Sequence, residues 1–188
     1  MSQDSTSTLF PRLETKRLML RETTNKDVAA VFAIFSDPKT TQFHNLDTFT
    51  HINEAIEVIE RRAIGFKNQR GIRWGIARKA DDCLIGSCGF TWNKEVTAAE
   101  VGYELKSEFW RQGIMSEALQ VILQYGFEDK QLQFIIAEIM PENIASKKRL
   151  EKFSFHSQGI SNKHGYWKGK YHDLERFKLT RDNFKVTW

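Results

Sequence analysis

The sequence predicts an α/β domain in which helices pack on a mixed β-sheet. Three observations support this prediction. Short apolar segments typical of strands alternate along the chain with longer segments whose apolar residues recur at helical spacing. Residues 132–140 are almost continuously apolar, as expected of a strand buried on both faces. With 188 residues and 40% apolar side chains, the chain is long enough to bury a core of its own.

The first half of the chain contains apolar runs that polar segments separate. The predicted elements there are a strand at residues 17–21, a helix at 25–35, a polar loop at 39–50, a helix at 52–66 and strands at 74–78, 84–90 and 100–105. Thr24 or Asn25 is suited to cap the first helix, and the Asp37-Pro38 pair is expected to end it.

The second half continues the alternation. Its predicted elements are a helix at residues 115–127, the strand at 132–140, a basic helix from 143 to about 152, a strand that begins at 153–155, a glycine-containing turn at 164–170 and a last strand at 172–180. No internal repeat or low-complexity linker interrupts this order. We therefore expect a flexible leader over residues 1–12 and a single domain over residues 13–188.

Composition excludes several classes of protein. A net charge of +4 suits an anionic cofactor or an acidic partner. The sequence contains no concentrated block of Lys and Arg, so direct nucleic-acid binding is not expected. No segment is long and apolar enough to span a bilayer, so we expect a cytoplasmic protein without a membrane partner. Cys83 and Cys88 are expected to be reduced core thiols. No His or Cys occurs at metal-ligand spacing, so no metal is expected.

The most informative segment is residues 100–119, which are predicted to form a strand, a short basic turn and an amphipathic helix. Gly113 in this turn allows close backbone approach to a ligand. Free N–H groups and the helix dipole converge there, and Arg111 adds positive charge. The arrangement favours a phosphate group at the start of the helix, although a plain strand-to-helix connection has the same pattern.

A second helix start adds polar groups further along the chain. Asn143 is placed to cap this helix, and Ser146 follows within its first turn. Lys147, Lys148 and Arg149 come next, where they face either phosphates or solvent.

From residue 14 to about 183 the chain resembles the GNAT superfamily of N-acyltransferases, most closely its RimJ/RimL-type branch. The motifs follow in the family's order along the chain. They are Thr15-Lys-Arg-Leu-Met-Leu-Arg21, Phe35-Ser-Asp-Pro38, Leu84-Ile-Gly-Ser-Cys-Gly89, Ala99-Glu-Val-Gly-Tyr-Glu-Leu105, Trp110-Arg-Gln-Gly-Ile-Met-Ser-Glu-Ala118, Asn143-x-x-Ser146, Glu151-Lys-x-x-Phe155 and Asp173.

The resemblance implies a GNAT-type, mostly antiparallel sheet of about six or seven strands, flanked by about four helices and split into a V between the strands at 100–105 and 132–140. Acetyl-CoA is expected in the V as co-substrate, without a metal. The residues implied to bind it are Tyr103, Glu104, Leu105, Trp110, Arg111, Gln112, Gly113, Ile114, Met115, Ser116, Asn143 and Ser146.

The chain departs from the superfamily pattern at three positions. Trp110 stands at the first signature position, as it often does in the RimJ/RimL branch, and Met115 is bulkier than the usual small residue. The tyrosine acid that many members place near Leu150 is absent, and the resemblance implies that Ser146 donates the proton instead.

The expected chemistry is direct attack of a primary amine on the thioester in a ternary complex. The amine must lose a proton, and the oxyanion and the thiolate must be stabilised. Glu100 and Glu104 share one face of their strand, so either is a candidate base, directly or through water. Main-chain N–H groups near Glu104 and Leu105 are expected to hold the oxyanion. His44 lies in the loop before the second helix. It either borders the entry of the acceptor or is a solvated loop residue.

Several functions remain open at this point. The first is acetylation of a protein N-terminus, for example on a ribosomal protein, and the second is acetylation of a small amine such as a polyamine, an aminoglycoside or an amino-acid-like compound. A non-catalytic acyl-CoA-binding module is the third. The fourth is a basic RNA-binding domain, but the sequence lacks the pattern of aromatic residues among Lys and Arg clusters that such domains show. The aromatic residues of 164–171 are expected to line the acceptor groove, to form a dimer contact or to pack on the sheet. A homodimer is suggested by the prevalence of two-fold symmetry alone.

Overall fold

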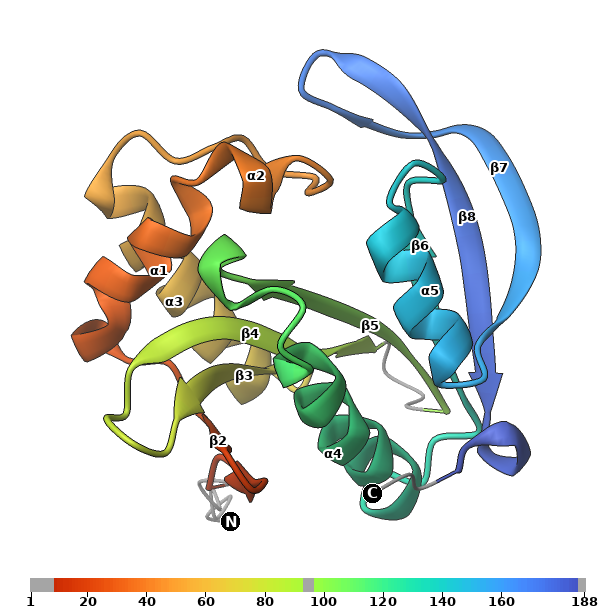
Figure 1. Cartoon of the computed structure of the whole chain (residues 1–188), viewed down its shortest axis with the longest axis horizontal. Coiled ribbons are helices and arrows are strands. Elements are labelled where there is room, and N and C mark those ends of the chain that lie inside the picture. Colours follow the sequence, from red (N-terminus) through yellow and green to blue (C-terminus); the bar gives the residue numbers. More distant parts are fainter. Residues whose placement is uncertain (1–8, 93–96, 186–188) are drawn as a thin grey trace, which may run out of the picture.

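The computed structural model describes residues 9–92 and 97–185, and shows a twisted mixed sheet with helices on both faces (Figure 1). Within these residues the sheet has eight strands, in the order β1-β2-β3-β4-β5-β6-β8-β7, and there are five α-helices. The strands are β1 (Leu13–Glu14), β2 (Leu18–Arg21), β3 (Gly71–Arg78), β4 (Leu84–Trp92), β5 (Ala98–Leu105), β6 (Phe134–Ile139), β7 (His156–Trp167) and β8 (Lys170–Thr180). The helices are α1 (Val28–Phe35), α2 (Pro38–Thr41), α3 (Ile52–Lys67), α4 (Ile114–Glu128) and α5 (Ile144–Lys152).

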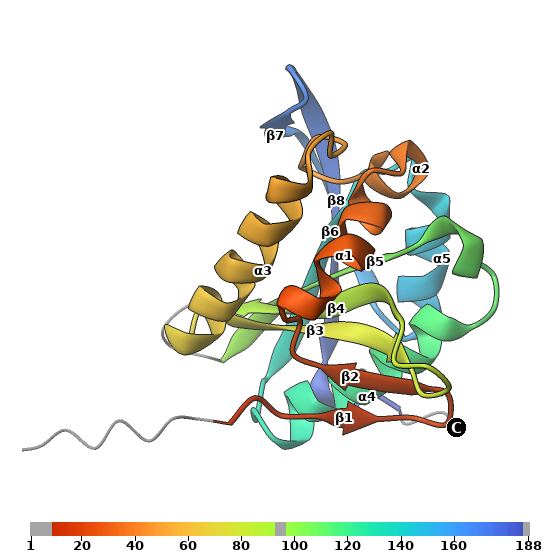
Figure 2. The same ribbon diagram turned by 90° about the vertical axis from the view of Figure 1, so that its left-hand side faces the viewer.

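Two apolar clusters hold the layers together. Helices α1 and α3 cover one face of the sheet, here called the α3 face, and α4 covers the other, the α4 face (Figures 1 and 2). The larger cluster lies on the α4 face, where the fully buried Trp74 packs edge-on against Tyr125 of α4, with ring centroids 5.1 Å apart. The smaller cluster joins α1 to α3. The predicted fold class is therefore confirmed, with slightly more strands than expected.

A split in the sheet is the feature that positions the site. Neighbouring strands pair antiparallel except β5 and β6, which run parallel and pair only from Ala98 to Glu100 with residues 134–136. Beyond Glu100 the two strands diverge. The remainder of β5 thus has an edge that β6 does not cover, which is the V-shaped split that the resemblance implied.

One predicted loop contains a helix. Residues 39–50 were expected to be irregular, but Pro38–Thr41 forms α2. Proline is tolerated in the first helical turn, where its missing N–H is not needed. The Asp37 carboxylate caps this turn by accepting a hydrogen bond from the Lys39 N–H at 2.9 Å. The Asp37-Pro38 pair therefore ends α1 as predicted and also starts the next helix.

The C-terminal hairpin is longer than predicted. Its first strand begins at His156 instead of residues 153–155, because Phe153 caps α5 and Ser154 takes a left-handed conformation with φ 62°. The turn expected over 164–170 shrinks to Lys168 and Gly169, whose φ values of 50° and 72° suit a tight two-residue hairpin turn.

Two expectations about burial are wrong. Strand β6 is not buried on both faces, because only Ile135 and Ala137 are buried among its six residues. Phe134, Ile136 and Glu138 on its other face are only partly buried, because they lie beside the split from β5. Cys88 is a buried free thiol as predicted, but Cys83 is free and exposed, so it is not a core residue.

The N-terminal end of the described chain packs on the core. Residues 1–8 of the expected leader lie outside the described residues, whereas Phe10 packs against the core with its ring 4.8 Å from that of Phe66. In the described part of the chain, no helix has the length and apolar character needed to cross a membrane.

Candidate active site

The connection from β5 to α4 forms the first part of the site. Arg111 and Gly113 both have positive φ, 61° and 74°, so the chain turns sharply just before α4. The first helical hydrogen bond runs from the Glu117 N–H to the Gly113 carbonyl at 3.0 Å. The N–H groups of residues 114–116 therefore have no partner within the helix and point out of its N-terminal end. This is the arrangement that binds phosphate oxygens.

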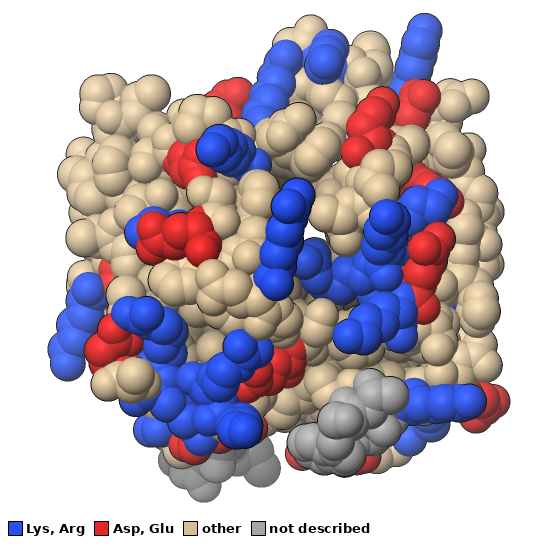
Figure 3. Space-filling view, in the orientation of Figure 1, with Lys and Arg blue, Asp and Glu red and all other residues tan. Residues whose placement is uncertain are grey.

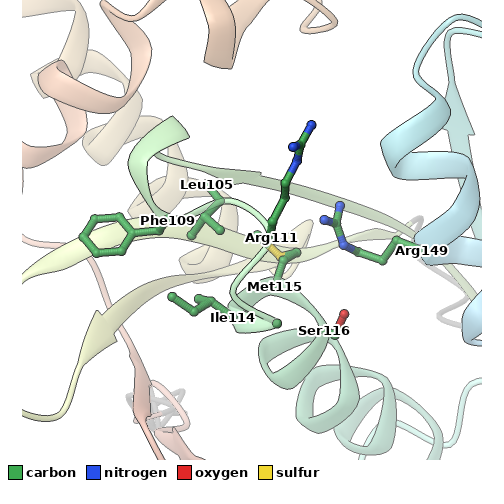
Figure 4. A pocket seen from close by; sticks show the side chains of 8 residues that line it. Leu105, Phe109, Arg111, Ile114, Met115, Ser116 and Arg149 are labelled. Carbon is green, nitrogen blue, oxygen red and sulfur yellow. The ribbon is translucent and has the colours of Figure 1, made fainter.

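A cavity of about 160 Å³ lies at this helix start, on the α4 face (Figure 4). Its lining consists of Leu105, Phe109, Arg111, Gly113, Ile114, Met115, Ser116 and Arg149. Lys and Arg side chains gather on this face around the start of α4 and over α5 (Figure 3). The structure thus brings together two cations from separate elements, Arg111 and Arg149, beside free helix N–H groups.

Three residues of the signature segment have structural contacts. The Trp110 indole N–H donates to the Leu105 carbonyl at 2.7 Å, which closes the turn between strand and helix. Met115 is 2% exposed and packs into the core, so its bulk is accommodated inside the protein. Gln112 turns away from the cavity, because its side chain donates to the Glu108 carbonyl at 3.0 Å.

The connection between β1 and β2 braces this turn. The Glu117 carboxylate in the first turn of α4 accepts hydrogen bonds from the Arg17 N–H at 2.9 Å, from Arg17 Nε at 2.6 Å and from the Thr15 hydroxyl. Arg17 Nη1 in turn donates to the Gln112 carbonyl at 3.0 Å. Arg17 and Glu117 therefore fix the turn in the conformation that exposes the helix N–H groups.

The resemblance implies that acetyl-CoA binds at this turn. On that basis we expect Glu117→Gln to raise KM for acetyl-CoA about tenfold and to leave kcat unchanged, because a loosened turn weakens ground-state and transition-state binding equally. Steady-state kinetics with varied acetyl-CoA measures this effect. Glu128→Gln at the exposed end of the same helix is the matched control. A fall in kcat at unchanged KM would show that the brace acts on the chemical step instead.

A hydroxyl pair forms the second part of the site. Tyr103 Oη and Ser146 Oγ lie 2.5 Å apart, joining β5 to α5 on the α4 face. Burial raises the pKa of Tyr103, so its phenol stays protonated at neutral pH. The Arg149 guanidinium lies over the Tyr103 ring, 5.5 Å from its centroid. Sequence reasoning assigned only the main chain of Tyr103 to the site and missed this hydroxyl, although the alternation along β5 places it on the same side as the buried Val101.

The start of α5 is organised as predicted from its cap. The Asn143 side-chain oxygen accepts from the Ser146 N–H at 3.1 Å, which fixes Ser146 beside Tyr103. Of the basic residues that follow, Lys147 does not face the cavity, because it pairs with Glu175 at 2.9 Å on the C-terminal hairpin. Arg149 alone of this basic run lines the cavity.

The two candidate carboxylates of β5 have different environments on the α3 face. Glu104 is 5% exposed and pairs with Arg62 of α3 at 2.9 Å, with Arg73 of β3 and with the Ser87 hydroxyl. Although burial opposes ionisation, the two arginines lower the pKa of Glu104 to about 2. A carboxylate with so low a pKa is a weak proton acceptor, so Glu104 is poorly suited to act as a general base.

The pKa of Glu100 is shifted in the opposite direction. It lines a second cavity of about 440 Å³ at the closed end of the V, together with Trp92, Phe134 and Ile136 among others. Although much of Glu100 remains exposed, desolvation in this cavity and the nearby charge of Glu138 raise its pKa. A raised pKa makes the carboxylate a stronger base.

Glu138 is a site residue that sequence reasoning missed. Glu100 pairs with Ile136 in the parallel register, so Glu138 of β6 shares the α3 face with Glu100 and lies where the two strands diverge. Arg176 holds it in place with hydrogen-bond and ion-pair contacts at 2.8 and 2.7 Å. The available signal was a single carboxylate within the apolar run of residues 132–140.

Other predicted residues border this face. Burial lowers the pKa of His44, whose ring packs edge-on against Phe35 with centroids 5.7 Å apart. Lys168 at the tip of the C-terminal hairpin donates to the Thr41 carbonyl at 2.6 Å, so the hairpin reaches across to α2. Among residues 9–92 and 97–185, no cluster of His, Cys, Asp and Glu has the arrangement needed to hold a metal ion.

Comparisons with known proteins agree with this geometry. Residues 17–156 match the model of the acetyltransferase (GNAT) domain. The chain is 36% identical over 174 residues to YoaA of Bacillus subtilis (strain 168), an uncharacterized N-acetyltransferase, and the match covers 92% of this chain and 98% of YoaA.

Two solved structures illustrate the fold. RimL, a ribosomal L7/L12 alpha-N-protein acetyltransferase in complex with coenzyme A, superposes with a TM-score of 0.82 at 20% identity, covering 92% of this chain and 99% of RimL. MccE, a microcin C7 self immunity acetyltransferase in complex with acetyl-CoA and AMP, superposes with a TM-score of 0.79 at 18% identity. The match covers 88% of this chain and 93% of MccE. At these identities the likeness to solved structures is evidence of the fold alone.

Proposed function

This chain belongs to the GNAT acetyltransferase family, and we propose that it transfers the acetyl group of acetyl-CoA to the N-terminal amine of a protein, such as a ribosomal protein. The observation that carries the proposal is the V between β5 and β6, flanked on the α4 face by a helix start with unpaired N–H groups and two arginines, and on the α3 face by carboxylates. The likeness to RimL supports a protein N-terminus as acceptor.

The residues on the α4 face account for binding of acetyl-CoA. We assign the free N–H groups of residues 114–116, with Arg111 and Arg149, to its diphosphate. The uncovered main chain of Tyr103, Glu104 and Leu105 is assigned to the pantetheine arm and to the thioester oxygen, with Asn143 alongside. Ser146, hydrogen-bonded to the Tyr103 hydroxyl, is placed to protonate the departing thiolate.

Glu100 is our candidate for the general base, directly or through water. Desolvation and the nearby charge of Glu138, which pairs with Arg176, raise the pKa of Glu100. Glu104, with its low pKa, is assigned to holding Arg62 and Arg73 beside the V. The amine therefore approaches the thioester from the α3 face and loses its proton toward Glu100.

We expect Glu100→Gln to lower kcat about 100-fold, the usual scale of general base catalysis. In the unsubstituted enzyme, activity falls as pH drops through the raised pKa of Glu100, so the acid limb of kcat/KM lies above pH 4.5. Glu138→Gln removes the neighbouring charge and moves this limb to lower pH. Glu57→Gln on the exposed side of α3 is the control. An unchanged kcat in Glu100→Gln would show that a water chain, and not Glu100, accepts the proton of the amine.

The acceptor is tested by locating the acetyl group. Incubation with acetyl-CoA and synthetic peptides, followed by mass spectrometry, should give acetylation at the peptide N-terminus. The same peptides with a blocked N-terminus and a free lysine serve as the control. Acetylation of the blocked peptides at lysine, with none at free N-termini, contradicts the proposal. Small amines are the alternative acceptor class.

A further inference from the structure

A pair of arginines on the α3 face has more positive charge than its carboxylate partner neutralises. Arg62 and Arg73 both bind Glu104, and no other acidic side chain among the described residues pairs with either of them. Burial lowers the pKa of Arg62 to about 10, which leaves it cationic at neutral pH. The cluster therefore carries one unbalanced positive charge. His44 does not add to it at neutral pH, because burial lowers the pKa of its imidazole.

The same pair has hydrogen-bond donors to spare. Arg62 uses one Nη atom on Glu104, and Arg73 uses Nη2 on Glu104 and Nε on Ser87 at 2.8 Å. In the part of the chain that the structure describes, no nitrogen of either guanidinium is both buried and unpartnered. The unused donors therefore face space that solvent can reach, where an anion can reach them as well.

The unused donors lie at the open part of the V. A Cβ atom added to Gly102 would come within 2.9 Å of Arg73 Nη1, so this guanidinium lies directly over the β5 main chain. Gly102 is two residues from Glu100 on the same face, a separation of about 7 Å along a strand. The α3 face thus offers the carboxylate side chain of Glu100 and an unneutralised guanidinium over a backbone position roughly 7 Å further along the same strand.

We propose that the acceptor carries an anionic group roughly 7 Å from its reactive amine, and that Arg73 with Arg62 binds this group while the amine points toward Glu100. This inference rests on the proposed acetyl transfer and specifies its substrate class. A carboxylate in the second residue of a peptide fits the spacing, and so does a short amino acid such as 4-aminobutyrate. Polyamines and aminoglycosides lack the anion and meet the unbalanced positive charge of Arg62 and Arg73.

Binding and turnover of matched acceptors test the proposal. The peptide set begins Ser-Asp, Ser-Asn and Ser-Lys with identical remaining residues, and the small-molecule set is 4-aminobutyrate and its amide. We expect the acidic member of at least one set to bind the enzyme–CoA complex about tenfold more tightly than its amide. Kinetics should show the same ratio in KM for the acceptor.

Arg73→Met should abolish this preference without changing KM for acetyl-CoA, and Arg73→Lys should restore part of it. Arg73→Met leaves Glu104 paired with Arg62, and Arg78→Met on the same strand is the matched control for folding and activity. Equal binding of acid and amide by the unsubstituted enzyme, or a preference that survives in Arg73→Met, overturns the inference. Selective binding of the acid without acetylation of any acceptor overturns the proposed function and leaves the anion site standing.

Discussion

Replacing Ser146 with alanine is expected to lower kcat about 100-fold, the scale of a lost general acid, while KM for acetyl-CoA stays nearly unchanged. The Ser146 hydroxyl lies 2.5 Å from the Tyr103 hydroxyl of β5, and this pair is our proposed proton source. The helix itself should be unaffected, because its cap uses the Ser146 N–H and not the side chain. Single-turnover kinetics with saturating acetyl-CoA isolates the chemical step.

The control for this experiment is Ser161→Ala in the exposed strand β7, which should behave as the unsubstituted enzyme. Tyr103→Phe provides the second comparison. If Ser146→Ala retains full turnover and Tyr103→Phe loses it, the proton donor is the tyrosine. Full turnover in both variants contradicts any role of the pair in proton transfer.

Glu104→Gln is expected to lower the free energy of unfolding by about 3–5 kcal/mol, because it leaves two arginines without their counter-charge. Arg62 and Glu104 are both nearly excluded from solvent, with side chains 14% and 2% exposed. Glu108→Gln removes an exposed carboxylate paired with Lys106, and should cost well under about 1 kcal/mol. Urea unfolding measured at neutral pH compares the two variants.

The stabilisation by Glu104 should also depend on pH. Its pKa falls from an ordinary 4.5 to about 2 in the folded protein, so its contribution is complete above pH 4.5 and is lost as pH drops toward 2. The difference in stability between the unsubstituted protein and Glu104→Gln should therefore shrink across this range. A difference that is constant from pH 6 to pH 2 would show that the Glu104 charge does not stabilise the fold.

Local patterns predicted the elements around the cofactor side well. The helical spacing of apolar residues and the single glycine at 113 indicated where α4 begins, and the Asn143 cap indicated α5. These features depend on residues close together in the chain, which sequence alone records. The short helix α2 was missed because its sequence contains a proline and two threonines, which resemble a loop.

The acceptor side was much less predictable, because it depends on contacts between distant segments. Glu104 meets Arg62 and Arg73, 42 and 31 positions away, and nothing in the strand pattern of residues 100–105 distinguishes its pKa from that of Glu100. Glu138 joins Glu100 only through the parallel pairing of β5 with β6. Strand alternation indicated the face on which these carboxylates lie, and only the fold supplied their partners.

The most direct test of the account is release of CoA from acetyl-CoA, with a pool of short N-terminal peptides set against a panel of small amines. We predict sustained release with the peptides, fastest for those with an acidic second residue, and slow release with polyamines and aminoglycosides. Absence of release with every amine, while acetyl-CoA still binds, would contradict the claim that this V supports acetyl transfer to an amine.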